Sequence, residues 1–117
     1  MKGFYLTRRA ILFIRDSYDY SVENWGETRA DEYVNNLYID FNRLANNIEL
    51  GESRNNRSFP FLMYPSGRHY IVYEFFKESI IVITVLHQVR NIENIINEFS
   101  STFYNEIEML KLELKEQ

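Results

Sequence analysis

The part of the chain that most constrains its fold is Pro65–Asn91, which reads PSGRHYIVYEFFKESIIVITVLHQVRN. It contains two β-rich runs, Tyr70–Phe76 and Ile80–Leu86, in which Val, Ile, Tyr and Phe dominate, as a packed, pleated surface requires. Only Lys77-Glu78-Ser79 separates the two runs, which is too short a break for a helical crossover. The two runs are therefore predicted to pair as an antiparallel hairpin.

Polar residues stand at the open end of this hairpin. They precede the first run and follow the second one. Because antiparallel pairing places the start of one strand beside the end of the other, these polar side chains are predicted to lie together, where a scaffold can present them to a partner. The predicted cluster consists of Arg68, His69, His87 and Arg90.

Two helices are predicted before the sheet region. Thr7 is a suitable N-cap for a first helix over Arg8–Glu23, and Gly26 can adopt the left-handed conformation that ends a helix and turns the chain. A second helix, over Ala30–Ile48, has one apolar stripe at steps of three and four residues. The connection is short, so the two helices are predicted to be antiparallel neighbours that form a helical hairpin.

The remaining segments complete the predicted order of elements. A short strand at the sheet edge is expected at Lys2–Thr7, and Asn46–Asn56 is expected to be a polar loop. The run Ser58–Tyr64 contains Pro60, so it is predicted to be a short, irregular or edge strand. A turn follows at Pro65-Ser66-Gly67.

From Ile92 the pattern is helical again, with apolar residues on one face, acidic residues on the other, and no proline or glycine. The order β-α-α-β-β-β-α predicts an α+β domain, with the helical hairpin packed on a small antiparallel sheet and an extended C-terminal helix. We expect residues 1–91 to form the main domain and residues 92–117 to be its amphipathic extension. Within this extension we expect Ile92–Phe99 to pack on the domain and Phe103–Leu114 to contact another molecule, such as a second copy.

Charge is unevenly distributed along the chain. Residues 1–90 carry eleven Lys or Arg and eleven Asp or Glu, whereas residues 91–117 carry two Lys and six Glu, which is the whole net charge of −4. The segment Arg54–Arg90 is mildly basic, with five basic and two acidic residues. This pattern favours an anionic partner at the sheet, with the tail glutamates screening Arg68 and Arg90. Two ordinary solvated surfaces are the equally weighted alternative.

Composition excludes several classes of protein. An apolar fraction of 45% and an aromatic fraction of 16% argue against disorder. No apolar run approaches the ~20 residues of a membrane helix, and the N-terminus has no signal-peptide pattern. Without cysteine, and with two histidines, neither a disulfide framework nor a dedicated metal site is expected. No motif for a cofactor is found, and a cytoplasmic location is the simplest expectation.

Four short motifs occur in a characteristic order along the chain. They are Leu6-Thr7, Trp25-Gly26, Gly67–Tyr73 and Val85–Asn91. Together with the apolar positions of the second helix, they resemble the ParE branch of the RelE/ParE toxin superfamily of bacterial type II toxin–antitoxin systems, over roughly residues 4–91. The sequence departs from the pattern at two positions, since Phe13 replaces a frequent acidic residue and Asn91 replaces the closing aspartate.

This resemblance implies a protein that binds and poisons DNA gyrase and is neutralised by a cognate ParD-like antitoxin wrapped around it. It implies no catalytic residue, no cofactor and no metal. It places target binding at Arg68, His69, His87 and Arg90. It places antitoxin binding at Trp25, Tyr33, Leu37 and Phe41.

RelE-like relatives instead cleave mRNA on the ribosome, which requires an acid or base near the 2′-hydroxyl and cations for the phosphate. In this sequence those groups would be His87, Arg68 and His69, with Arg57 as a further cation. Tyr70 stands where such nucleases tend to carry an arginine, and residues 1–90 are neutral, so we rank gyrase first. A third alternative is an inactive relative that only binds the antitoxin.

Several of these residues also have a simpler structural interpretation. His69 is expected to be a surface turn residue, and His87 to bond backbone groups at a strand end. Trp25 is expected to close the helical hairpin as a core aromatic residue. Glu74, in the middle of a strand, is expected to face solvent.

Overall fold

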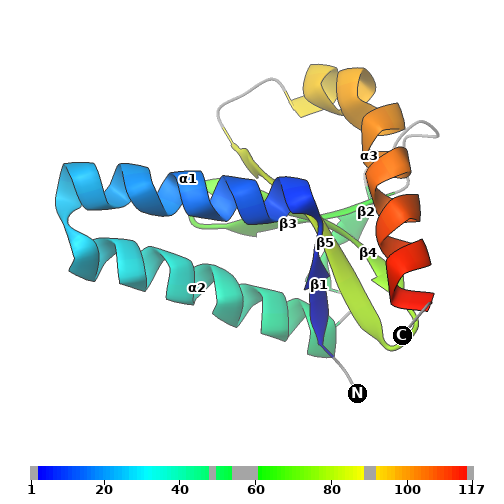
Figure 1. The fold of residues 1–117 in the computed structure, drawn as a ribbon, viewed down its shortest axis with the longest axis horizontal. Coiled ribbons are helices and arrows are strands. Elements are labelled where there is room, and N and C mark those ends of the chain that lie inside the picture. The colour runs from blue at the N-terminus through cyan, green and yellow to red at the C-terminus, as the bar shows by residue number, and fades with distance from the viewer. Residues whose placement is uncertain (1–2, 48–49, 54–60, 89–91, 116–117) are drawn as a thin grey trace.

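The computed structural model describes residues 3–47, 50–53, 61–88 and 92–115. These residues form one five-stranded sheet with the strand order β1-β5-β4-β3-β2, together with three helices among the described segments. Figure 1 shows α1 and α2 running side by side and α3 lying apart from them. The elements are β1 (Phe4–Leu6), α1 (Arg8–Trp25), α2 (Glu27–Asn46), β2 (Glu52–Ser53), β3 (Leu62–Ser66), β4 (His69–Phe76), β5 (Ser79–His87) and α3 (Ile92–Lys115).

Thr7 fixes both the start and the position of α1. Its Oγ1 accepts a hydrogen bond from the Ala10 amide at 3.1 Å, which confirms the predicted N-cap. The same hydroxyl donates to the Ile83 carbonyl at 2.6 Å, which ties the first turn of α1 to β5. Thr7 is only 2% exposed, so water does not compete for either bond.

The predicted helical hairpin is confirmed. Gly26 has φ 91° and separates α1 from α2, and its amide donates to the Val22 carbonyl at 3.0 Å, which closes the last turn of α1. The apolar stripe of α2 faces the sheet, and its buried members are Ala30, Leu37, Phe41, Leu44 and Ala45. The helix ends at Asn46, and Ile48 lies outside the described residues.

The central prediction, the β4–β5 hairpin, is also confirmed, in a register that runs from His69 opposite His87 to Phe76 opposite Ser79. A register shift between Val72 and Tyr73 marks a bulge. The sheet as a whole is mixed rather than antiparallel, because β1 pairs in parallel with β5. No tight turn joins β1 and β5, so their relative direction is not fixed by a local connection. The hydrogen bond from Thr7, at the start of α1, to Ile83 of β5 holds β1 in this parallel direction.

The region before the hairpin differs from the prediction in detail. The expected loop at Asn46–Asn56 contains β2, a two-residue strand that pairs with Leu62 and Met63 of β3. Pro65 and Ser66 belong to β3 rather than to a turn, and the chain reverses at Gly67-Arg68. β2 does not extend as far as Pro65, so proline is tolerated there without a lost ladder bond to that strand. The predicted start of this strand, Ser58–Pro60, lies outside the described residues.

The sheet is buried on both faces. One face lies under α1 and α2, with Phe41, Leu44, Ile71, Tyr73 and Val82 among the buried residues. The other face carries a second cluster, which contains Phe61, Met63, Val72, Ile81, Ile83, Leu86 and, from α3, Ile107. Burial on both sides explains why β5 is apolar along nearly its whole length.

Part of the apolar stripe of α3 therefore packs on this chain's own sheet, whereas we expected Phe103–Leu114 to contact another molecule. Ile107 is 1% exposed in the second cluster, and Leu110 packs against that cluster. Glu74 does not simply face solvent either, because its carboxylate lies 2.9 Å from Lys111 Nζ of α3. The side chains of the expected packing segment Ile92–Phe99 lie outside the described part of the chain. None of the helices described is both long and apolar enough to cross a membrane.

Candidate functional site

An open groove lies between α1 and α3, with the end of β5 at its floor. Its volume of about 1440 Å³ exceeds the roughly 300–1,000 Å³ that small-molecule pockets usually enclose. Arg8, Arg9 and Leu12 contribute to one wall, and Glu106 and Met109 contribute to the other. A groove of this size and openness suits a macromolecular segment better than a metabolite.

The predicted polar cluster lies at one end of this groove. His69 and His87 stand opposite each other on β4 and β5, with ring centroids 5.1 Å apart. His69 is half-buried, and its ring centroid lies 5.6 Å from that of Phe13 and 5.8 Å from that of Tyr33. It is therefore enclosed by rings rather than a plain surface turn residue, and Phe13, which departs from the family pattern, helps to enclose it.

Gln88, the first residue after β5, braces the turn on which Arg68 lies. Its amide donates to the Arg68 carbonyl at 3.0 Å, and its Nε2 donates to the carbonyls of His69 at 2.8 Å and Gly67 at 3.2 Å. These three bonds hold the β3–β4 turn against the end of β5. The Arg68 side chain itself is exposed and lines the groove.

Burial controls the protonation of the cluster. Desolvation lowers the pKa of His69, and the nearby charge of His87 lowers it further, so His69 is neutral at pH 7. Burial also raises the pKa of Tyr33, so its phenol keeps its proton. The site can thus offer an exposed guanidinium, a neutral imidazole and a phenol. In the described residues, no group of three or more His, Asp or Glu side chains is placed to hold a metal.

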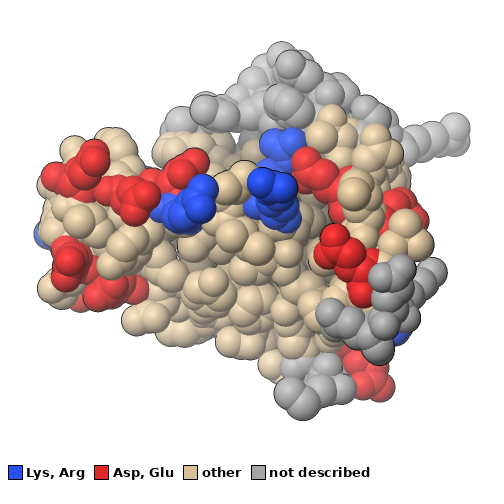
Figure 2. All heavy atoms as spheres, in the orientation of Figure 1, with Lys and Arg blue, Asp and Glu red and all other residues tan. Residues whose placement is uncertain are grey.

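A glutamate of the acidic tail pairs with Arg9, which was not among the two arginines predicted, Arg68 and Arg90. Glu106 of α3 binds Arg9 of α1, with Oε1 2.9 Å from Nη2, whereas Arg68 makes no ion pair with any described residue. Figure 2 shows Lys and Arg side chains over α1, between acidic groups at the helical-hairpin turn and along α3. Arg90 and Arg57 lie outside the described residues.

The residues expected to bind an antitoxin fall into two groups. Leu37 and Phe41 are 2% and 0% exposed in the core, so a direct contact with a partner is excluded and that prediction is corrected. Tyr33 is half-buried in the groove, and Trp25 is 55% exposed beside Tyr20, with ring centroids 5.6 Å apart. Trp25 is therefore not a core residue, because the turn of the helical hairpin projects beyond the sheet (Figure 1).

Sequence reasoning missed the groove-facing side of α1. Ala10 and Ile14 of this helix are buried, whereas Leu12 and Tyr20 line the groove from an adjacent side of the helix. The signal was present as apolar residues outside the main stripe. On α3, Met109 and Leu112 are exposed, and the contact with a second copy stays a prediction for which these two side chains are accessible.

Comparisons with known proteins agree with this geometry. A family model described as the ParE toxin of the type II toxin–antitoxin system parDE matches residues 4–92. Toxin ParE1 of Caulobacter vibrioides is 30% identical over 91 residues, which are 78% of this chain and 94% of that protein. A solved chain described as the chromosomal ParDE TA system from P. aeruginosa has the same fold, with a TM-score of 0.62 and 15% identity, over 74% of this chain and 96% of that one. The chain therefore belongs to the ParE toxin family of type II toxin–antitoxin systems.

Proposed function

We propose that this ParE-family toxin arrests growth by binding DNA gyrase through the rim formed by Arg68, His69 and His87. The supporting observation is that these side chains, two of them exposed, stand together beside an open groove rather than inside a closed pocket. Such a site can recognise a macromolecular surface without chemistry of its own. A cognate ParD-like antitoxin neutralises the toxin, with Trp25 and Tyr33 as contact residues, and both act in the cytoplasm.

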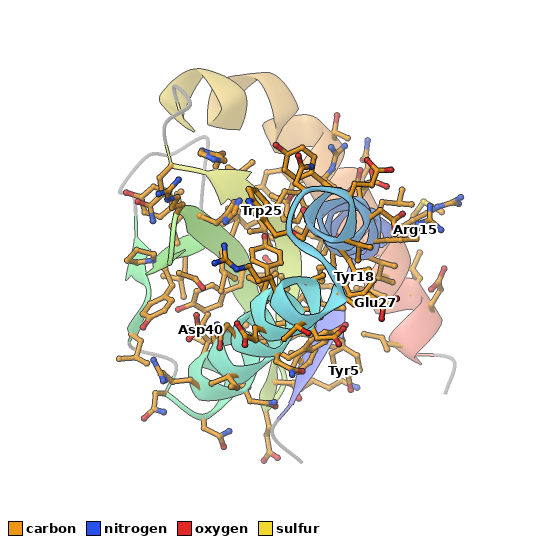
Figure 3. All side chains as sticks on the ribbon, turned by 90° about the vertical axis from the view of Figure 1, so that its left-hand side faces the viewer. Tyr5, Arg15, Tyr18, Trp25, Glu27 and Asp40 are labelled. Carbon is orange, nitrogen blue, oxygen red and sulfur yellow. The ribbon has the colours of Figure 1, made fainter. Side chains whose placement is uncertain are left out.

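The test is a supercoiling assay with purified gyrase. Arginine is enriched among the interface residues whose truncation costs more than about 1 kcal/mol, so Arg68→Ala should raise the half-inhibitory concentration at least about five-fold. Arg15→Ala is the matched control, because Arg15 is also exposed but lies outside the groove, on a different side of α1 from Trp25 (Figure 3). Inhibition that Arg68→Ala weakens no more than Arg15→Ala does would refute the assignment of gyrase binding to this rim.

The histidine pair supports mRNA cleavage on the ribosome as a second candidate function. Neutral His69, exposed His87 and the Arg68 cation are the groups that acid–base cleavage of a phosphodiester uses. Against it, Asp16, Glu106 and Glu113 also line the groove and would repel phosphates.

Induction in bacteria separates the candidates. Gyrase poisoning produces SOS induction and filamentous cells in which translation continues. Ribonuclease action produces rapid translation arrest, which His87→Ala and Arg68→Ala should each abolish. Normal growth would instead favour an inactive relative that serves as an antitoxin-binding subunit.

A further inference from the structure

α3 is largely an addition to the part of the chain that the family shares. The family model ends at residue 92, where α3 begins. The match to the relative from Caulobacter covers 94% of that protein but 78% of this chain. The match to the chain from P. aeruginosa covers 96% of that chain but 74% of this one. The family match therefore leaves out almost the whole of α3, so the role of this helix has to be sought in its contacts in this chain.

The described half of α3 packs on the second face of the sheet, over the cluster that lies there. Ile107 is buried and Leu110 is half-buried against a cluster that includes Met63, Val72 and Ile83. Without α3 these strand residues would form a contiguous apolar surface, which a soluble protein normally keeps for a partner. α3 thus occupies a surface that is built to accept an amphipathic helix.

Two ion pairs at the borders of this contact hold α3 in place. Arg9 pairs with Glu106 at 2.9 Å, with 35% and 29% of the two side chains exposed. Lys111 pairs with Glu74 at 2.9 Å, with 26% and 20% exposed. Ion pairs with this much solvent contact are weak and sensitive to salt. The attachment is therefore specific in position but reversible.

The docked helix also changes the groove next to it. Glu106 and Glu113 of α3 line the same groove as Arg68, and Glu106 neutralises Arg9 on the opposite wall. An anionic segment of a partner that approached Arg9 would have to displace this carboxylate. The position of α3 consequently sets it in direct competition with such a partner.

We propose that α3 is a built-in inhibitory segment, which masks the second face of the sheet and neutralises Arg9 until it is released. This inference rests on the proposed function, because inhibition has meaning only for an active toxin. Release of α3 exposes the apolar face of the sheet and removes Glu106 from Arg9 on the α1 wall of the groove. The toxin with α3 released therefore binds its target more tightly than the toxin with α3 docked.

The test uses the full chain with a reversed anchor. Glu106→Arg places two cations together, whereas the charge-swapped variant Arg9→Glu/Glu106→Arg restores an opposite pair. Glu108→Arg is the matched control, because it makes the same charge change at an exposed position on the same helix that lies outside the groove. Hydrogen exchange of the α3 amides reports docking, and the half-inhibitory concentration in the gyrase assay reports activity.

We expect Glu106→Arg to accelerate exchange in α3 and to lower the half-inhibitory concentration about three- to ten-fold relative to Glu108→Arg, since breaking and reversing one partly exposed pair has an effect of that order. The charge-swapped variant should return both values toward those of the unmodified protein. Unchanged exchange, or faster exchange with equal or weaker inhibition, overturns the proposal. If no variant inhibits gyrase, the proposed target is wrong, and growth arrest by the same variants in cells still decides whether α3 restrains the toxin.

Discussion

Replacement of Thr7 by valine is the sharpest test of how this fold is held together. Valine has nearly the same shape as threonine, so the substitution removes the hydroxyl and leaves the packing almost unchanged. That hydroxyl caps α1 at the Ala10 amide and donates to the Ile83 carbonyl of β5. Both bonds are buried, so water cannot replace either of them in the folded variant.

The magnitude follows from the two bonds. Loss of an N-cap costs about 1 kcal/mol. A buried carbonyl that loses its donor costs about 1–3 kcal/mol more. Thr7→Val should therefore lower the free energy of unfolding by about 2–4 kcal/mol, which for a chain of this size lowers Tm by roughly 8–16 °C. Thr7→Ser keeps the hydroxyl and loses one methyl group, at about 0.8 kcal/mol.

Urea denaturation of the three proteins, followed by circular dichroism, measures these differences. The slope of the free energy against urea should be the same for all three, so that only the midpoints differ. A Thr7→Val variant within 0.5 kcal/mol of the unmodified protein would refute the reasoning. A Thr7→Ser variant as unstable as Thr7→Val would also refute it, since the methyl group would then be the important part.

Three further outcomes are expected in the same denaturation assay. A Cβ at Gly51 would lie 1.9 Å from the hydroxyl oxygen of buried Tyr73, so Gly51→Ala should destabilise by about 1–3 kcal/mol, and an unchanged midpoint would contradict the packing. Gly67 and Lys77 both have φ of 58°, so Gly67→Ala should lose about 1 kcal/mol while Lys77→Gly should gain up to about 1 kcal/mol, and equal signs would count against this. Burial lowers the pKa of His69, so as the pH falls the unfolded state binds a proton at this residue before the folded state does. The free energy of unfolding should therefore decrease as the pH drops below about 6.5 toward the lowered pKa, and it should decrease less in His69→Phe.

The parts of the fold that the sequence predicted are those set by local pattern. Two β-branched runs with a short break can form little other than a hairpin, and its register places His69 opposite His87. The N-cap at Thr7 and the stripe of α2 were equally readable, because capping chemistry and helical spacing involve residues only a few positions apart.

The errors have a common physical cause, which is that a pattern shows which residues share a face but not what that face meets. Trp25 looked like a core residue, yet the end of α1 extends past the sheet and leaves it exposed. The stripe of α3 looked suited to a second molecule, yet Ile107 is buried on this chain's own sheet. The parallel direction of β1 depends on a contact with β5 across most of the chain, so no local signal announced it.

That long-range pairing has a consequence during protein synthesis. Thr7 and Ile83 are 76 positions apart, so at roughly 5–20 residues per second the ribosome adds the second one roughly 4–15 s after the first. Until β5 has emerged, β1 has no neighbouring strand and His87 does not exist. Translation products that end before β5 would therefore lack both the completed sheet and His87.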